Sequence, residues 1–411
     1  MEHFIENEQR ILKRLAQEWY ITHGGGEIEL SPKSKYRYFL MKPVELFREM
    51  FNLEREIIVL FSPYLTFEPR SLNAINHAIQ QYESLRIDPI CSVMISNDPY
   101  IEDRLNNLIT SDPEARIVVP FTYEELMAPI DAYFIRNRFK SHFYTRDLFA
   151  FEAPLRKDLY FFGRTDLIHR LVNRDRSNEG SGLFGLRKTG KTSVIFAVQR
   201  ALSKRSGISV FIDCQNTAFH RRKWNEALHY IIAELKNQHH LNFDTATEDS
   251  YTEENASLLF EQEICKIHKQ LGNKNILIIF DEVENITFDI SPSEHWAKES
   301  DFINFWQTLR SLFQKLNNVF AFLIIGTNPL CIETPSIRGI DNPIFNLVPF
   351  EYIPKFDVPQ TREMVRKIGR IMGLHFDELI YGKLTEDFGG HPFLIRHVCS
   401  VCCQSAKWDT F

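Results

Sequence analysis

A stretch of glycines, a lysine and hydroxyl side chains carries the clearest chemistry in the sequence. Residues Gly185 to Thr192 read G-x-x-x-x-G-K-T, the pattern of a phosphate-binding loop between a strand and a helix. In such a loop the backbone N–H groups face phosphate oxygens, Lys191 reaches the β- and γ-phosphates, and the Thr192 hydroxyl holds Mg²⁺. The predicted phosphate-binding residues are Gly185, Leu186, Arg187, Lys188, Thr189, Gly190, Lys191, Thr192 and Ser193.

Two carboxylates follow an apolar run further along the chain. The run 276–280 is apolar throughout, as expected of a strand buried on both faces of a parallel sheet. Such a strand delivers Asp281 to the edge of the sheet beside the loop, where it is predicted to hold Mg²⁺ through water. Glu282 is predicted to be the general base for an attacking water, a role that contributes about 10²–10⁴ in rate. Glu284 is expected to be solvated or to cap a loop.

An aromatic-x-Gly-Arg signature at 160–164 precedes the loop. Together with the loop, the Asp-Glu strand and the Gly-Gly-His-Pro sequence at 389–392, it resembles the nucleotide-binding domain of STAND and archaeal-type ATPases, relatives of the AAA+ proteins. The resemblance covers roughly residues 158–400 and implies ATP and Mg²⁺ as ligands. It also implies that Phe162, Gly163 and Arg164 flank the base; the alternative is a buried aromatic turn.

The resemblance assigns roles to two further segments. Related ATPases insert a strand between the loop strand and the Asp-Glu strand, and its terminal Thr or Asn senses the γ-phosphate. The run 320–326 ends in Thr327 and Asn328, of which Asn328 is favoured, although Asn-Pro also initiates turns. In STAND ATPases a Gly-x-Pro element belongs to a helical lid, so Pro392 would pack on the base and His391 would lie near the phosphates.

Two arginines are weaker candidates for the same chemistry. An arginine finger at Arg338 would act on the nucleotide of a neighbouring subunit, but a surface role is favoured. The AAA+ pattern has an arginine in the helix after the lid motif. Arg396 is the candidate for it, with unfavourable spacing.

The N-terminal third reads as alternating strands and helices. Strands are predicted over 56–61, 89–96 and 116–120, and helices over 71–85 and 100–109, which favours a small parallel sheet. A helical pattern near the N-terminus is expected to be broken at Gly24-Gly25-Gly26. The strand ends offer no convincing catalytic set, so a sensor or docking role is favoured; these ends carry Ser62, Tyr64, Asn97, Asp98 and Thr122.

Basic and aromatic residues alternate in two stretches, 33–42 and 131–158. Either stretch could contact nucleic acid. A half-buried strand edge for the first and a connector for the second are favoured, because the net charge of −6 gives no overall attraction to nucleic acid.

Composition sets broader limits. The 411 residues suggest two to three domains, and no apolar run approaches the roughly 20 residues of a membrane span. The seven cysteines are predicted to be reduced thiols in a cytoplasmic protein, because their spacing fits no zinc site.

The sequence thus predicts an α/β protein in three parts. These are an N-terminal α/β sensor, effector or docking domain (1–155), a parallel-sheet P-loop ATPase core (156–345) and a C-terminal helical lid (346–411). The predicted function is an ATP-hydrolysing switch of the STAND/AAA+ type, in bacterial or antiviral defence as one interpretation, with a homo-oligomer or a protein partner. The alternative is a nucleic-acid motor or loader resembling origin-recognition ATPases. Nucleic acid is not favoured as a partner, and no membrane is expected.

Overall fold

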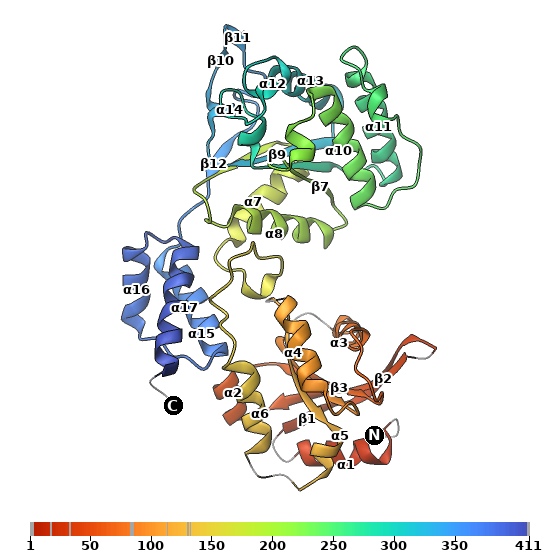
Figure 1. Ribbon diagram of the computed structural model, residues 1–411, viewed down its shortest axis with the longest axis vertical. Coiled ribbons are helices and arrows are strands. Elements are labelled where there is room, and N and C mark those ends of the chain that lie inside the picture. Colours follow the sequence, from red (N-terminus) through yellow and green to blue (C-terminus); the bar gives the residue numbers. More distant parts are fainter. Residues whose placement is uncertain are drawn as a thin grey trace. The chain divides into compact units, whose positions relative to one another are not determined.

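The computed structural model describes residues 4–16, 19–32, 34–82, 86–112, 114–129, 131 and 133–408. The chain forms two compact units (Figure 1). The first unit contains Met1–Ala153, Asp357–Gly390 and Leu394–Phe411, and the second contains Pro154–Phe356 and His391–Phe393. Residues 357–390 therefore group with the N-terminal part of the chain. The division into three domains with a separate lid stays a prediction.

A five-stranded parallel sheet forms the centre of the second unit, with the strand order β12-β6-β9-β8-β7. Its strands are β6 (Ser181–Phe184), β7 (Ile208–Asp213), β8 (Ile276–Asp281), β9 (Phe320–Gly326) and β12 (Phe350–Tyr352). The predicted α/β fold with a parallel-sheet core is confirmed, and β9 lies between β6 and β8 as expected. This order places the carboxyl ends of β6, β9 and β8 side by side.

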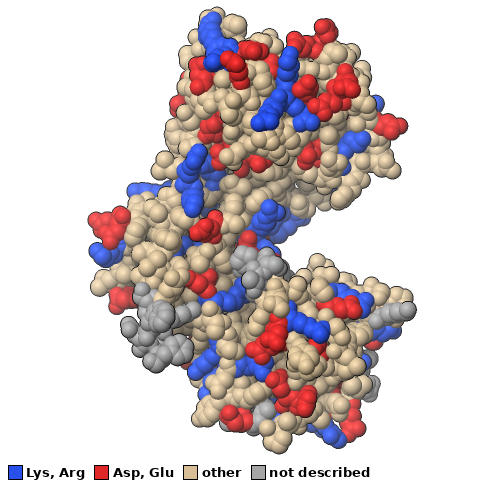
Figure 2. Space-filling view, viewed as in Figure 1, with Lys and Arg blue, Asp and Glu red and all other residues tan. Residues whose placement is uncertain are grey.

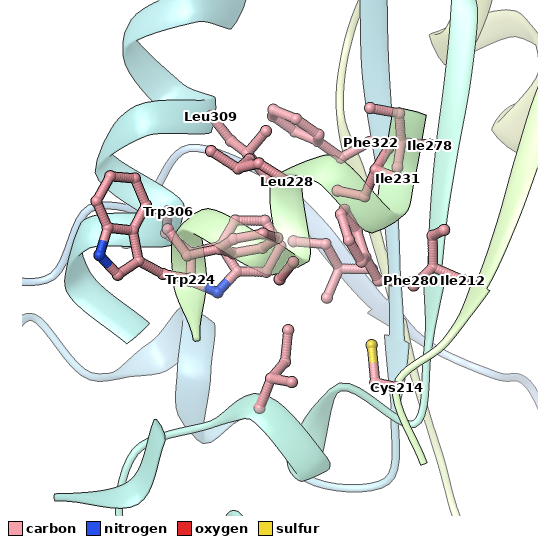
Figure 3. Close-up of a cluster of buried hydrophobic side chains, with 14 of the residues drawn as sticks. Ile212, Cys214, Trp224, Leu228, Ile231, Ile278, Phe280, Trp306, Leu309 and Phe322 are labelled. Atoms are coloured by element: carbon pink, nitrogen blue, oxygen red, sulfur yellow. The ribbon is translucent and has the colours of Figure 1, made fainter. Parts of the chain in front are cut away.

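Helices cover both faces of this sheet (Figure 1). One face carries α7 (Thr165–Arg176) and α8 (Lys191–Ser203); the other carries α10 (Trp224–Gln238), α11 (Ala256–Gln270) and α13 (Asp301–Lys315). Alternate residues of β8 enter the two cores, because successive strand side chains point to opposite faces. Figure 3 shows Ile278 and Phe280 of β8 in the larger core with Leu228 of α10 and Trp306 of α13.

Short elements connect these helices and strands. They are η1 (Asp158–Tyr160), α9 (Thr217–His220), η2 (Glu248–Ser250), η3 (Val283–Ile286), α12 (Glu294–Ala297), α14 (Leu330–Glu333), β10 (Ser336–Ile337) and β11 (Ile340–Asp341). Within the described ranges, no helix has the length and apolar character needed to cross a bilayer.

A second five-stranded sheet, in the order β1 to β5, forms the described core of the first unit. Its strands are β1 (Trp19–Ser31), β2 (Ser34–Pro43), β3 (Glu56–Ser62), β4 (Ile87–Ser96) and β5 (Ile117–Thr122). The last three strands are parallel, as predicted, whereas β1 and β2 are antiparallel. The helices are α1 (Glu6–Leu15), α2 (Glu45–Phe51), α3 (Arg70–Gln80), α4 (Ile101–Ser111), α5 (Tyr123–Met127), α6 (Phe134–Phe143), α15 (Val358–Ile371), α16 (Glu378–Asp387) and α17 (Pro392–Trp408).

Two expectations about the N-terminal segment were wrong. The glycines 24–26 lie inside β1 instead of breaking a helix, and β2 is an inner strand instead of an edge. Gly25 has φ +98°, and a Cβ there would lie 2.4 Å from the Phe4 ring and 2.6 Å from the Tyr38 carbonyl oxygen. Packing across the sheet therefore requires glycine. Lys33 and residues 83–85, at the ends of two predicted elements, lie outside the described residues.

Candidate functional site

The loop at 185–190 joins the end of β6 to the start of α8, and its two motif glycines are explained differently. Gly190 has φ +94° and precedes the first residue of α8, a conformation that favours glycine. Gly185 is explained by close packing, because a Cβ there would lie 2.3 Å from Ile353 Cγ2. The first N–H groups of a helix lack intrahelical acceptors and favour an anion. The second unit therefore has the P-loop fold, with the loop at the predicted place.

Lys191 lies beneath this loop with its side chain directed back to the loop backbone. Its Nζ donates to the carbonyl oxygens of Gly185 (2.8 Å) and Leu186 (3.0 Å), and the residue is only 5% exposed. Burial lowers the pKa of Lys191, and nearby carboxylates, Glu282 first, oppose that shift. In the described structure no carboxylate forms an ion pair with this ammonium. A buried cation without a paired anion fits a site that takes a phosphate.

Thr192 and Asp281 meet next to Lys191, although they are far apart in sequence. The Thr192 hydroxyl donates to Asp281 Oδ2 at 3.0 Å, which joins the first turn of α8 to the end of β8. Asp281 is 4% exposed, and burial raises its pKa to about 6, against the effect of the hydrogen bond from Thr192. Hydroxyl and carboxylate oxygens are the hard ligands that Mg²⁺ prefers, so this pair fits the predicted metal role.

Glu282 follows Asp281 in a left-handed backbone conformation, with φ +52°. This conformation is uncommon for a residue other than glycine, and such residues cluster at functional sites. The Glu282 N–H donates to Asp281 Oδ1 at 3.0 Å. Its side chain is half-buried, and burial and then the charge of Glu284 raise its pKa. A raised pKa favours a carboxylate that accepts a proton.

Glu284 binds the backbone that follows β9. It therefore caps a loop, which is the second of the two roles predicted for it from the sequence. Glu284 Oε1 accepts hydrogen bonds from the backbone N–H groups of Thr327 and Asn328, at 2.8 Å for Asn328. The Thr327 hydroxyl then lies 3.4 Å from Lys191 Nζ. The exposed Asn328 side chain instead accepts from the Leu330 N–H at 3.0 Å, where it caps a turn. The geometry thus favours Thr327 over Asn328, the residue favoured from sequence.

Phe162, Gly163 and Arg164 line a cavity along α7 and α8 whose described lining includes no residue of 185–192. Arg164 is 4% exposed, donates to the Pro354 carbonyl oxygen, and its guanidinium lies 4.8 Å from the centre of the Phe356 ring. Burial lowers its pKa to about 10. That these residues flank a base stays a prediction.

Residues His391–Phe393, which group with the second unit, contact the phosphate-binding loop. His391 Nε2 lies 3.3 Å from the Arg187 carbonyl oxygen, and Lys188 Nζ lies 4.1 Å from the centre of the Phe393 ring. Pro392, between them, begins α17. The sequence pointed to His391 and Pro392 through the motif, but it gave no signal for the pairing of Lys188 with Phe393.

Both candidate arginines donate hydrogen bonds to backbone carbonyl oxygens outside the phosphate-binding loop. Arg396 donates to the Leu148 carbonyl oxygen at 2.7 Å and lies over the Phe151 ring. Arg338 pairs with Asp289 at 3.0 Å and donates to the Ala297 carbonyl oxygen at 2.9 Å. These contacts agree with the surface role favoured for Arg338.

Polar residues at the strand ends of the first unit stabilise loops. Asp98 is fully buried, accepts from the N–H groups of Phe67 (2.7 Å) and Tyr100 (2.9 Å), and pairs with Arg104. Thr122 caps α5. Throughout the described ranges, no group of three or more His, Cys, Asp or Glu residues could hold a metal ion.

No protein-family model matches the chain, and no curated protein matches it. Three solved structures with similar folds are a Walker-type ATPase of Pyrococcus abyssi (14% identity, 60% of this chain and 69% of that chain, TM-score 0.46), the ORC2 protein of Aeropyrum pernix (15%, 64% and 67%, 0.41) and domain III of the Thermotoga maritima replication initiation protein DnaA (12%, 60% and 87%, 0.34).

Proposed function

We propose that the protein binds Mg·ATP at the loop 185–192 and hydrolyses its β–γ bond, as a conformational switch. The observation that carries this proposal is the convergence of Lys191, the Thr192–Asp281 pair and Glu282 at the carboxyl edge of one parallel sheet. Ligands bind outside the carboxyl ends of strands in open parallel sheets.

Each residue has a distinct proposed role. Lys191 would exchange its two carbonyl acceptors for phosphate oxygens, which supply the anion that the buried ammonium lacks. Thr192 and Asp281 would hold Mg²⁺, which neutralises charge on the phosphates when bound. Glu282 would accept a proton from the attacking water, and the Thr327 hydroxyl, 3.4 Å from Lys191 Nζ, would contact the γ-phosphate.

The finer proposal is a switch of the STAND/AAA+ type, in which His391 to Phe393 respond to the nucleotide. It is supported by the contacts of this segment with Arg187 and Lys188. A role in bacterial defence signalling is supported by the sequence resemblance alone. A nucleic-acid motor or loader is the alternative. A salt titration separates the two, because a motor binds nucleic acid with a steep negative salt dependence, whereas a switch has little affinity.

Two variants test the proposed chemistry. Lys191→Ala should abolish ATP binding in calorimetry, because it removes the buried ammonium that is proposed to bind the phosphates. Glu282→Gln should keep ATP binding and reduce phosphate release by about a hundredfold. Lys274→Ala and Glu299→Gln, which change exposed residues of the same unit, serve as matched controls. Normal hydrolysis by Glu282→Gln would show that another group is the base.

A further inference from the structure

A further aspartate, Asp213, lies at the carboxyl edge of the central sheet of the second unit. It ends β7, as Asp281 ends β8. The two strands are parallel neighbours, and Asp213 and Asp281 are partners in the register. Neighbouring strands lie about 4.8 Å apart, so the two carboxylates leave the sheet from adjacent positions. Asp213 has no role in the chemistry proposed above.

The side chain of Asp213 belongs to the same face of the sheet as α8. Figure 3 shows its sequence neighbours Ile212 and Cys214 in the larger core, which lies on the face of α10 and α13. Because successive strand side chains point to opposite faces, Asp213 points to the other face. The side chain of Asp281 is on that face as well, where it accepts a hydrogen bond from Thr192 of α8.

Asp213 carries a charge that its own contacts do not neutralise. Its Oδ1 accepts from the Gln215 N–H at 2.9 Å, and the residue is exposed. Among the described residues, no cation forms an ion pair with Asp213, Asp281 or Glu282. Burial is the largest cause of the raised pKa of Asp281 and of Glu282, and the charge of Asp213 adds to it in both. Asp213 therefore interacts electrostatically with the proposed site.

This concentration of negative charge is local. The whole chain has a net charge of −6, and both signs are interspersed over the face seen in Figure 2. At the ends of β7 and β8, by contrast, Asp213, Asp281 and Glu282 follow one another around one edge. A triphosphate adds further negative charge there, and a divalent cation offsets it.

We propose that Asp213 makes the site select ATP that carries a divalent cation over ATP that does not. The inference rests on the proposed function and adds a residue that determines its specificity. The carboxylate of Asp213 repels a bare triphosphate, and it favours a divalent cation at Thr192 and Asp281. Asp213 thus acts through its charge, whereas Glu282 keeps its proposed role as the base.

Calorimetry with the β,γ-imido analogue of ATP, which is not hydrolysed, tests the proposal. The analogue is titrated once with excess Mg²⁺ and once with EDTA. Asp213→Asn should bind the metal-free analogue about three- to tenfold more tightly than the wild type does, because one repelling charge is removed. It should bind the Mg²⁺-loaded analogue no more tightly than the wild type. The difference between the two proteins should shrink at high salt, because the carboxylate is exposed to screening.

Two further variants separate charge from structure. Asp213→Asn itself keeps an oxygen that can accept from the Gln215 N–H, so the turn after β7 should persist. Asp213→Glu keeps the charge and should keep the wild-type preference for the Mg²⁺-loaded analogue. Asp244→Asn changes an exposed aspartate in the loop after α10 and should leave both affinities unchanged.

The outcomes that contradict the inference are distinct from those that contradict the proposed function. If the wild type binds the analogue and Asp213→Asn keeps the same ratio of affinities with Mg²⁺ and with EDTA, the inference alone is wrong. An equal loss of both affinities would assign Asp213 a structural role and also overturn it. Loss of ATP hydrolysis with an unchanged ratio would make Asp213 the base instead. No binding to the wild type in either condition would overturn the ATP site and this inference together.

Discussion

At the scale of single residues, the site combines buried charges with partners that only partly satisfy them. Lys191 is held by neutral carbonyl oxygens, and Asp281 by a hydroxyl and a backbone N–H. Burying a charge without an opposite charge is unfavourable, and each group responds by a pKa shifted toward its neutral form. A ligand with phosphates and a divalent cation would stabilise both charged forms together.

The choice between Thr327 and Asn328 gives a paired prediction. Thr327→Ala should lower kcat for ATP hydrolysis by roughly tenfold to a hundredfold, because it removes a hydroxyl that lies 3.4 Å from Lys191 Nζ. Asn328→Ala should lower kcat less than about threefold, because its side chain caps a turn. Steady-state kinetics of the two variants decide the matter, and the reverse ranking would restore Asn328 as the sensor.

Asp175 gives a prediction about pH. Burial raises its pKa to about 6, against a hydrogen bond from Asn275. The folded state thus favours the protonated form, whose stabilising contribution is full below pH 3.8 and is lost as the pH rises through about 6. Between about pH 4.5 and 7.5, Asp175→Asn should gain up to about 3 kcal/mol relative to the wild type in urea unfolding. The exposed Asp166→Asn on the same helix should show no such trend.

At the scale of elements, one side chain fixes the ends of two neighbouring strands. Glu284 follows β8, and its carboxylate binds the N–H groups that follow β9. Gly326 is needed for this approach, because a Cβ there would lie 2.8 Å from Glu284 Oε2. The position of Thr327 therefore depends on a residue of another strand.

Removing this carboxylate should loosen the edge of the sheet. Glu284→Ala leaves two backbone N–H groups without their acceptor, so the free energy of unfolding should fall by about 1–3 kcal/mol in urea. Glu284→Gln keeps an acceptor oxygen and should lose less. Glu299→Ala, at an exposed position, is the matched control and should change stability little. Equal stability of Glu284→Ala and the control would mean that the two hydrogen bonds contribute nothing.

The sequence predicted elements whose signals are local. The apolar runs of β8 and β9 and the glycine pattern of the loop each occupy one short window, and the structure has them in place. The sequence analysis did not predict β12, because Phe350–Tyr352 has no apolar run. This strand is defined by its backbone pairing with β6. Gly25 was misinterpreted because its requirement comes from Phe4 and Tyr38 across the fold.

Within the candidate site, the limit of sequence analysis was side-chain direction. The loop pattern indicated Thr192 and the end of an apolar run indicated Asp281, and their side-chain oxygens lie 3.0 Å apart in the structure. The direction of the Thr327 side chain could not be predicted from the sequence, because the backbone of Thr327 and Asn328 is fixed by hydrogen bonds to Glu284.

At the scale of the whole molecule, α17 belongs to both compact units. Its first residues, Pro392 and Phe393, group with the phosphate-binding loop, and the residues from Leu394 onward group with the first unit. There Arg396 binds the Leu148 carbonyl oxygen and Ser400 binds Asp147 at 2.6 Å.

Assembly is the prediction that belongs to the whole molecule. Glu282→Gln should retain ATP, so light scattering after size-exclusion chromatography, with and without Mg·ATP, reports the state that ATP stabilises. A switch that assembles should shift to a larger species of defined mass only with Mg·ATP. Lys191→Ala, which is expected not to bind ATP, should show no shift. If the mass stays constant while ATP is bound, ATP-gated assembly is excluded, and the switch acts within its existing state.

The same experiment also tests whether Arg338 acts as an arginine finger. Its guanidinium is engaged by Asp289 and the Ala297 carbonyl oxygen of its own chain. Arg338→Ala should therefore assemble like its parent and keep ATP turnover within about threefold, whereas loss of an arginine finger costs 10³ or more. A loss of that size, rescued when the variant is mixed with Lys191→Ala chains that carry an intact Arg338, would mean that Arg338 leaves its intrachain partners in the assembled state and acts on the neighbouring nucleotide.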